Sequence, residues 1–166
     1  SPEYGFSLNI EDIDSNFTVG DIAKKYLEIR NRLISEGLID LNRALPTPFD
    51  FEQVLVIAPE NAAGLGDFKK DADALEMAGV CRFVYHYCLF QSTQAPIAIQ
   101  QTLKAALKAW SESTISPPDA IVIIRGGGAV NDLAYLNDYD LAALLCKRKV
   151  PVWVGIGHER DKTILD

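Results

Sequence analysis

Two short apolar segments of this chain are each followed by glycine and by side chains that could do chemistry. The first covers residues 120–124 and is followed by Arg125. The second covers residues 152–156 and is followed by His158 and Asp161. Apolar runs of this length, bounded by glycine, are typical of strands buried on both faces of a parallel sheet. Because parallel strands end at one edge, where ligands bind, we expect Arg125 and His158 to share one crevice.

These residue types favour chemistry on a phosphate group. The planar guanidinium of Arg125 can donate two parallel hydrogen bonds to phosphate oxygens. Glycines without side chains let backbone N–H groups approach an anion closely, and the three here are Gly126, Gly127 and Gly128. His158 can activate water or protonate a leaving oxygen near neutral pH. Asp161, or Asp67 after the apolar run 54–58, would orient the imidazole and stabilise its charged form.

Each candidate also has a purely structural interpretation. Asp67 could cap a helix that follows it, because carboxylates accept hydrogen bonds from the unpaired N–H groups at a helix start. Arg125 could form an ion pair with Asp132 or Asp161. His158 could be an ordinary loop histidine, although the aspartate three residues later favours a catalytic pairing. His86 lies within a predicted strand and is interpreted as a core or supporting residue.

Two common nucleotide-binding motifs are absent. The dinucleotide motif G-x-G-x-x-G is incomplete after residues 152–156, because Arg160 occupies the position of the third glycine. It is also incomplete at Gly64 and Gly66, where Lys69 stands in that position. No glycine is followed by the Lys-Ser or Lys-Thr pair of a phosphate-binding P-loop.

The composition is that of a globular domain with an acidic balance. The 166 residues are 48% hydrophobic and carry a formal net charge of −7. Binding along a nucleic-acid backbone normally needs a basic surface, so another module would supply most of the grip on such a partner. No run approaches the roughly 20 apolar residues of a membrane span, and no secretory signal is visible. We therefore expect a cytoplasmic protein with no membrane partner.

The three cysteines lack the spacing of a zinc site. Cys81, Cys88 and Cys146 include no C-x-x-C pair and have no nearby pair of histidines. We interpret them as buried, reduced thiols of a cytoplasmic protein rather than as catalytic groups or metal ligands.

The surrounding elements alternate in the way that a doubly wound protein requires. A first helix is expected between Thr18 and Gly37, and the prolines of the segment 45–48 mark a boundary before an α/β unit at 51–166. The expected strands are 54–58, 82–89, 120–124 and 152–156, and the expected later helices are 67–78, 96–110 and 139–149. Right-handed crossovers then predict a parallel, flavodoxin- or Rossmann-like sheet of about four strands in the order 2-1-3-4.

The motifs resemble the large subunit of exodeoxyribonuclease VII. The resemblance rests on the arginine–triglycine segment 125–133, on residues 136–138 and on the G-H-E-x-D segment 157–164. Residues 57–68 resemble the family's loop with its first acidic residue. Residues 1–50 resemble the end of an N-terminal OB-fold and a helical connector, so nearly the whole chain is covered.

The resemblance implies hydrolysis of single-stranded DNA from either end, giving 5′-phosphooligonucleotides without a required metal. The implied catalytic residues are Asp67, Arg125, His158 and Asp161. The OB-fold, which would grip DNA, and a downstream helical region, which would engage several small subunits, are expected outside this chain. This sequence departs from the family in having Asn131 at a commonly acidic position, and in the added positive charges of Arg160 and Lys162.

Two other functions remain open at this point. A metal-dependent phosphoesterase, with Mg²⁺ as a possible cofactor, would use oxygen ligands from Asp67, Asp132, Glu159 and Asp161. Activity that survives a chelator would count against it. A non-catalytic nucleotide- or phospholigand-binding module would use Arg125 and the glycines equally well, but it gives no reason for the pairing of histidine and aspartate.

Overall fold

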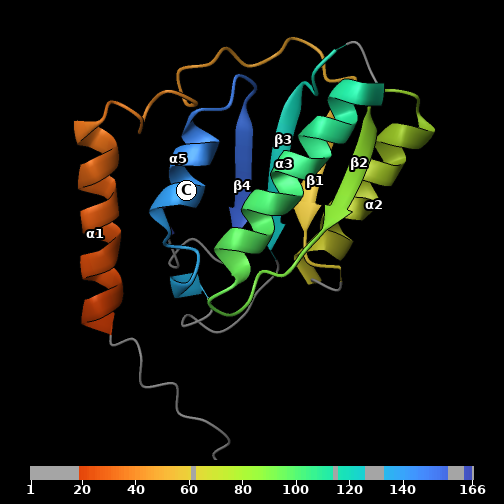
Figure 1. Cartoon of the computed structure of the whole chain (residues 1–166). Coiled ribbons are helices and arrows are strands. Elements are labelled where there is room, and N and C mark those ends of the chain that lie inside the picture. The colour runs from red at the N-terminus through yellow and green to blue at the C-terminus, as the bar shows by residue number, and fades with distance from the viewer. Residues whose placement is uncertain (1–18, 61–62, 114–115, 126–132, 157–162, 166) are drawn as a thin grey trace, which may run out of the picture.

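The computed structural model describes residues 19–60, 63–113, 116–125, 133–156 and 163–165. Helices and strands alternate along these residues, as expected for an α/β protein (Figure 1). The strands are β1 (Gln53–Ala58), β2 (Arg82–Tyr87), β3 (Ala120–Arg125) and β4 (Val152–Ile156). The helices are α1 (Val19–Ser35), α2 (Ala63–Met77), α3 (Ala95–Ser113) and α5 (Tyr139–Cys146). No helix among these residues is long and apolar enough to cross a membrane.

The four strands form one parallel sheet in the order β2-β1-β3-β4, which confirms the predicted fold class and strand order. The central strands β1 and β3 are almost entirely buried, because their apolar side chains alternate between two packed faces. Leu55 and Ile121 face α3 and α5, whereas Val56 and Val122 face α2. Each face holds a separate hydrophobic cluster, so the sheet is a rigid layer between helices.

Strand β4 differs from the expectation that it is buried on both faces. Its exposure alternates along the strand, and Trp153 remains 43% exposed. Val152 and Val154 contact the cluster below α3 and α5, but α2 contacts β2 and β3 on the opposite face. The indole of Trp153 packs instead against Phe51, with ring centroids 5.1 Å apart. The apolar run therefore describes an edge strand with one half-covered face.

The helix boundaries follow local capping chemistry. Helix α1 ends where Gly37 adopts a φ of 68°, and the N–H of Leu38 donates to the carbonyl of Leu33 at 2.8 Å. Helix α5 begins where Asp138 accepts a hydrogen bond from the N–H of Leu141 at 2.8 Å. It ends at Cys146, three residues before the expected end, because the chain must extend before Pro151 to enter β4.

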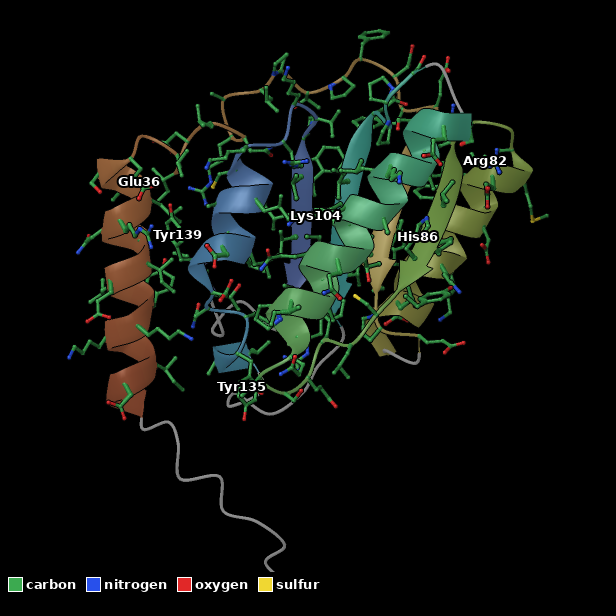
Figure 2. All side chains as sticks on the ribbon, in the orientation of Figure 1. Glu36, Arg82, His86, Lys104, Tyr135 and Tyr139 are labelled. Carbon is green, nitrogen blue, oxygen red and sulfur yellow. The ribbon has the colours of Figure 1, made fainter. Side chains whose placement is uncertain are left out.

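Helix α1 and the segment after it pack against the α/β unit. Ile29 and Leu33 form a small hydrophobic cluster with Ala142 and Ala143 of α5. The Tyr139 hydroxyl, labelled in Figure 2 beside Glu36, donates to that carboxylate. The guanidinium of Arg32 lies 3.4 Å from the centre of the Tyr139 ring and also donates to Glu36 at 2.9 Å. The division of the chain at residue 50 remains a prediction.

The side chain of Asn42 joins this connector to the sheet. Its amide nitrogen donates to the carbonyls of Arg148 and Val150, at 3.2 and 2.9 Å. Its amide oxygen accepts from the N–H of Val152 at 2.8 Å. One side chain thus satisfies three backbone groups around the amino end of β4, which is an open edge of the sheet.

Candidate functional site

The strand register brings the carboxyl ends of all four strands to one edge. Arg125, the last residue of β3, lies opposite Ile156, the last residue of β4. Ala58 and Tyr87, which end β1 and β2, lie opposite each other in the same way. The arrowheads in Figure 1 therefore point to one end of the molecule. The last residues of β3 and β4 therefore lie side by side, as the predicted shared crevice requires.

Part of the predicted site lies outside the described residues. This part comprises His158, Asp161, Gly126, Gly127 and Gly128, together with Asp132, Glu159 and Arg160 of the alternative interpretations. Their convergence with Arg125 and their roles remain predictions. The structure places the carboxyl ends of β3 and β4, together with Arg125 and Asp67.

Arg125 is buried at the end of a fully buried strand. Its residue surface is only 4% exposed, which is unusual for an arginine. The guanidinium stays protonated in proteins, so this strand end holds a fixed positive charge largely shielded from water. Charge interactions strengthen in such surroundings, because the local dielectric constant is lower than that of bulk water. An arginine placed in this way can stabilise negative charge on a bound phosphate.

Asp67 lies at the same end of the fold but on a solvent-exposed surface. It is the fifth residue of α2, because the helix begins at Ala63 rather than after the glycines at Gly64 and Gly66. The alternative that Asp67 caps the helix start is therefore wrong. Its side chain is 84% exposed and lies 3.5 Å from the ammonium nitrogen of Lys70. The structure thus pairs this carboxylate with a neighbour on its own helix.

The remaining titratable candidates fit supporting roles. His86 lies in the interior of β2, opposite Ile57, and is half-buried (Figure 2). All three cysteines have free thiols, and burial is the first cause of a raised pKa in each. Raised thiol pKa values keep these groups neutral and poorly nucleophilic. Among the described residues, no group of three or more histidine, cysteine, aspartate or glutamate side chains could hold a metal ion.

A polar–aromatic cluster beside the site was missed by the sequence reasoning. The ammonium nitrogen of Lys69 donates to the Tyr87 hydroxyl at 2.8 Å, and it lies 4.9 Å from the centre of the Tyr85 ring. A signal for this cluster did exist, since Phe83, Tyr85 and Tyr87 alternate along a strand that ends at the ligand-binding edge.

A cavity of about 600 Å³ lies elsewhere in the molecule. It is lined by residues of α1, the segment after α1, α5, β4 and residues 163–165, including Arg30, Arg43 and Trp153, and by neither Arg125 nor Asp67. It therefore belongs to the interface between the connector and the edge strand. The candidate site stays at the carboxyl edge.

The fold and this edge define a doubly wound α/β unit with a buried arginine at the carboxyl end of a central parallel strand. The chain belongs to the exonuclease VII large-subunit family, because the model described as "Exonuclease VII, large subunit" matches residues 38–166.

Curated relatives carry the same name. The chain is 47% identical over 165 residues to an exodeoxyribonuclease 7 large subunit of Deinococcus radiodurans, an alignment covering 99% of this chain and 39% of that protein. It is 31% identical over 148 residues to the protein of that name from Nostoc, covering 89% of this chain and 34% of the relative. The large subunit of Campylobacter lari is 32% identical over 149 residues, covering 90% and 36%. The chain thus spans little more than a third of the length of these relatives.

Proposed function

We propose that this chain is the catalytic part of an exodeoxyribonuclease that hydrolyses single-stranded DNA from either end. The products would be 5′-phosphooligonucleotides. The observation that carries the proposal is the buried Arg125 at the carboxyl end of β3, in a chain of this family. A shielded positive charge at a ligand-binding edge suits a reaction that builds negative charge on a phosphate.

The proposed chemistry divides among four side chains and three backbone amides. Water attacks phosphorus, the bond from phosphorus to the leaving oxygen breaks, and the proton taken from water is balanced by protonation of that oxygen. Arg125 and the amides of residues 126–128 stabilise the charge that develops on the non-bridging oxygens. His158 transfers the protons, and Asp161 or Asp67 holds the imidazole in its working orientation.

The proposed enzyme does not require a metal ion, although Mg²⁺ could still bind. In this mechanism Arg125 and the glycine amides supply the positive charge that a cation supplies in metal-dependent nucleases. The exposed carboxylate of Asp67, which is paired with Lys70, is compatible with a supporting role in that scheme.

The working enzyme would contain more than this chain. With a net charge of −7, the chain depends on other modules for its grip on DNA. We propose that an OB-fold provides this grip and that a helical region binds several exodeoxyribonuclease VII small subunits.

The test uses the full-length large subunit assembled with its small subunit. Single-stranded oligonucleotides labelled at the 5′ or the 3′ end, and a duplex of the same sequence, are incubated with excess EDTA. Short labelled products from both single-stranded substrates, and none from the duplex, are expected. Cleavage that stops in EDTA and returns with excess Mg²⁺ would instead support the metal-dependent phosphoesterase. Binding without any cleavage would support the phospholigand module.

A further inference from the structure

A cluster of one lysine and two tyrosines lies at the same sheet edge as Arg125. Lys69 of α2 donates to the Tyr87 hydroxyl at 2.8 Å, and its ammonium nitrogen lies 5.3 Å from the centre of that ring. The Tyr85 ring lies nearly parallel to that of Tyr87, with an angle of 18° and centroids 6.4 Å apart. These contacts hold an ammonium group and an aromatic ring side by side.

The cluster lies at the carboxyl end of β2, the strand next to β1 in the sheet. Tyr87 is the last residue of β2 and lies opposite Ala58, and β1 pairs on its other side with β3, which ends at Arg125. Neighbouring strands lie about 4.8 Å apart, so two strand spacings separate β2 from β3 by about 10 Å. Successive bases along a nucleic-acid strand are about 3.4 Å apart, so a few nucleotides span that distance.

Tyr87 is accessible, whereas the residues behind it are packed. The Tyr87 residue is 41% exposed at the end of its strand. Two residues earlier, Tyr85 packs against the hydrophobic cluster below α2, and before it the ring of Phe83 meets that of Phe68 edge-on at 5.6 Å. An exposed ring supported by packed neighbours loses little conformational freedom when a flat ligand binds to it.

Lys69 and Lys70 are the two cationic residues of α2 and lie in the half of the helix that begins at the carboxyl edge. Asp67, in the same half, lies 3.5 Å from the ammonium nitrogen of Lys70, and Asp71, Asp73 and Glu76 follow towards the far end. Burial, followed by the nearby charges of Asp73 and Glu76, raises the pKa of Tyr85 to about 12. Tyr85 is therefore a neutral phenol at physiological pH and does not repel an anion beside Lys69.

We propose that Tyr87 and Lys69 form a subsite for single-stranded DNA a few nucleotides from the cleaved phosphate. One base stacks on the Tyr87 ring, and the Lys69 ammonium binds a neighbouring phosphate oxygen. Every base has a flat π-face, so this subsite is tolerant of sequence. The Tyr87 hydroxyl accepts a hydrogen bond from the lysine and so positions its ammonium group. The subsite rests on the proposed nuclease function and extends it along the substrate.

The test compares variants of the assembled enzyme on two strands of equal length, oligothymidylate and a chain of abasic nucleotides. Tyr87→Ala should raise the KM for oligothymidylate about tenfold with little change in kcat, because it removes one base–aromatic stack. With the abasic strand added as a competitor of oligothymidylate cleavage, Tyr87→Ala should leave the inhibition constant of that strand unchanged. Lys69→Met should weaken binding of both strands, because one phosphate contact is lost. The slope of the logarithm of the binding constant against the logarithm of the salt concentration should become shallower by about 0.7.

Two further variants separate the contributions of the ring and the charge. Tyr87→Phe keeps the ring and should keep most of the preference for oligothymidylate over the abasic strand. Lys104→Met removes the same charge from the exposed surface of α3, on the other face of the sheet, and should change nothing (Figure 2). Tyr87→Leu replaces the ring by an apolar side chain and serves as the stacking-deficient variant if Tyr87→Ala fails to fold.

An unchanged KM for Tyr87→Ala and Tyr87→Leu, in an enzyme that still cleaves DNA, would overturn the subsite and leave the nuclease proposal intact. Equal weakening of both strands by these variants would also overturn it, because stacking needs a base. If the wild-type enzyme does not cleave DNA, the proposed function fails. Fluorescence anisotropy of labelled oligothymidylate then decides the subsite separately, and an equal Kd for wild type and Tyr87→Ala refutes it.

Discussion

Replacing Arg125 by lysine is the most direct test of the proposed chemistry. Lysine keeps the positive charge at the end of β3 but loses the planar fork that meets two phosphate oxygens at once. The site is 4% exposed, so water cannot readily replace the missing donor. Losing one preorganised donor costs about 10²–10³-fold in rate, or about 2.7–4 kcal/mol of transition-state stabilisation. We therefore expect kcat to fall by at least about 10²-fold.

The assay measures single-turnover cleavage of a labelled single-stranded oligonucleotide in EDTA, together with its equilibrium binding. Affinity should hardly change, because one contact is lost among many and the proposed OB-fold dominates binding. Arg82→Lys is the matched control, since Arg82 is an exposed arginine at the amino end of β2, on the opposite edge of the sheet (Figure 2). Arg82→Lys should cleave at the wild-type rate.

Two results would refute the reasoning about Arg125. Equal losses of rate and affinity would mark it as a binding residue, because uniform binding does not favour the transition state. An unchanged rate in a folded Arg125→Lys enzyme would show that the buried charge has a structural role. The melting temperature of each variant separates these outcomes from simple unfolding.

Three further predictions concern the framework around the site. Asn42→Ala should lower the free energy of unfolding in urea by about 2–3 kcal/mol, since three hydrogen bonds at about 1 kcal/mol each are lost; an unchanged urea midpoint would contradict this. The hydrogen bond from Tyr139, followed by that from Arg32, lowers the pKa of Glu36. The stability that ionised Glu36 contributes to the folded chain is therefore present above the ordinary glutamate pKa, and it is lost as pH falls through the lowered pKa. Tyr139→Phe should therefore destabilise the chain more at pH 7 than in acid, where Glu36 becomes protonated. An equal effect across a titration of stability from neutral to acid pH would exclude this linkage. Burial is the chief cause of the raised pKa values of the three thiols. They should therefore react slowly with iodoacetamide at pH 7 until urea unfolds the protein. Fast labelling of the native chain would show instead that they are accessible thiolates.

The sheet could be predicted from the sequence because its signals are local and mutually consistent. The apolar runs at 54–58 and 120–124 have the length of buried strands, and the helical stripe of Ile99, Leu103 and Trp110 is buried as expected. These patterns and the handedness of crossovers leave few possible strand orders. The carboxyl edge that holds Arg125 then follows from the fold class.

What could not be predicted depends on tertiary contacts. Two glycines, Gly64 and Gly66, indicated a loop, but they lie in α2 because burial of Leu65 in the core outweighs about 1 kcal/mol of helix propensity for each glycine. The uncovered face of β4 depends on where α2 lies, which an apolar run does not reveal. The contact between Lys69 of α2 and Tyr87 of β2 joins residues 18 positions apart, and each residue looks ordinary by itself.

The strand order also has a consequence for how the chain folds. The pairings of β1 with β2 and of β3 with β4 each join residues about 30 positions apart, and each can form within one βαβ unit. The pairing of β1 with β3 spans more than twice that separation, so closing it carries the largest loop entropy of the three. Lys69 and Tyr87 belong to the first unit and Arg125 to the second. The proposed substrate path is therefore completed only when the two halves dock, and we expect mutations at the β1–β3 seam to slow its assembly more than mutations within either half.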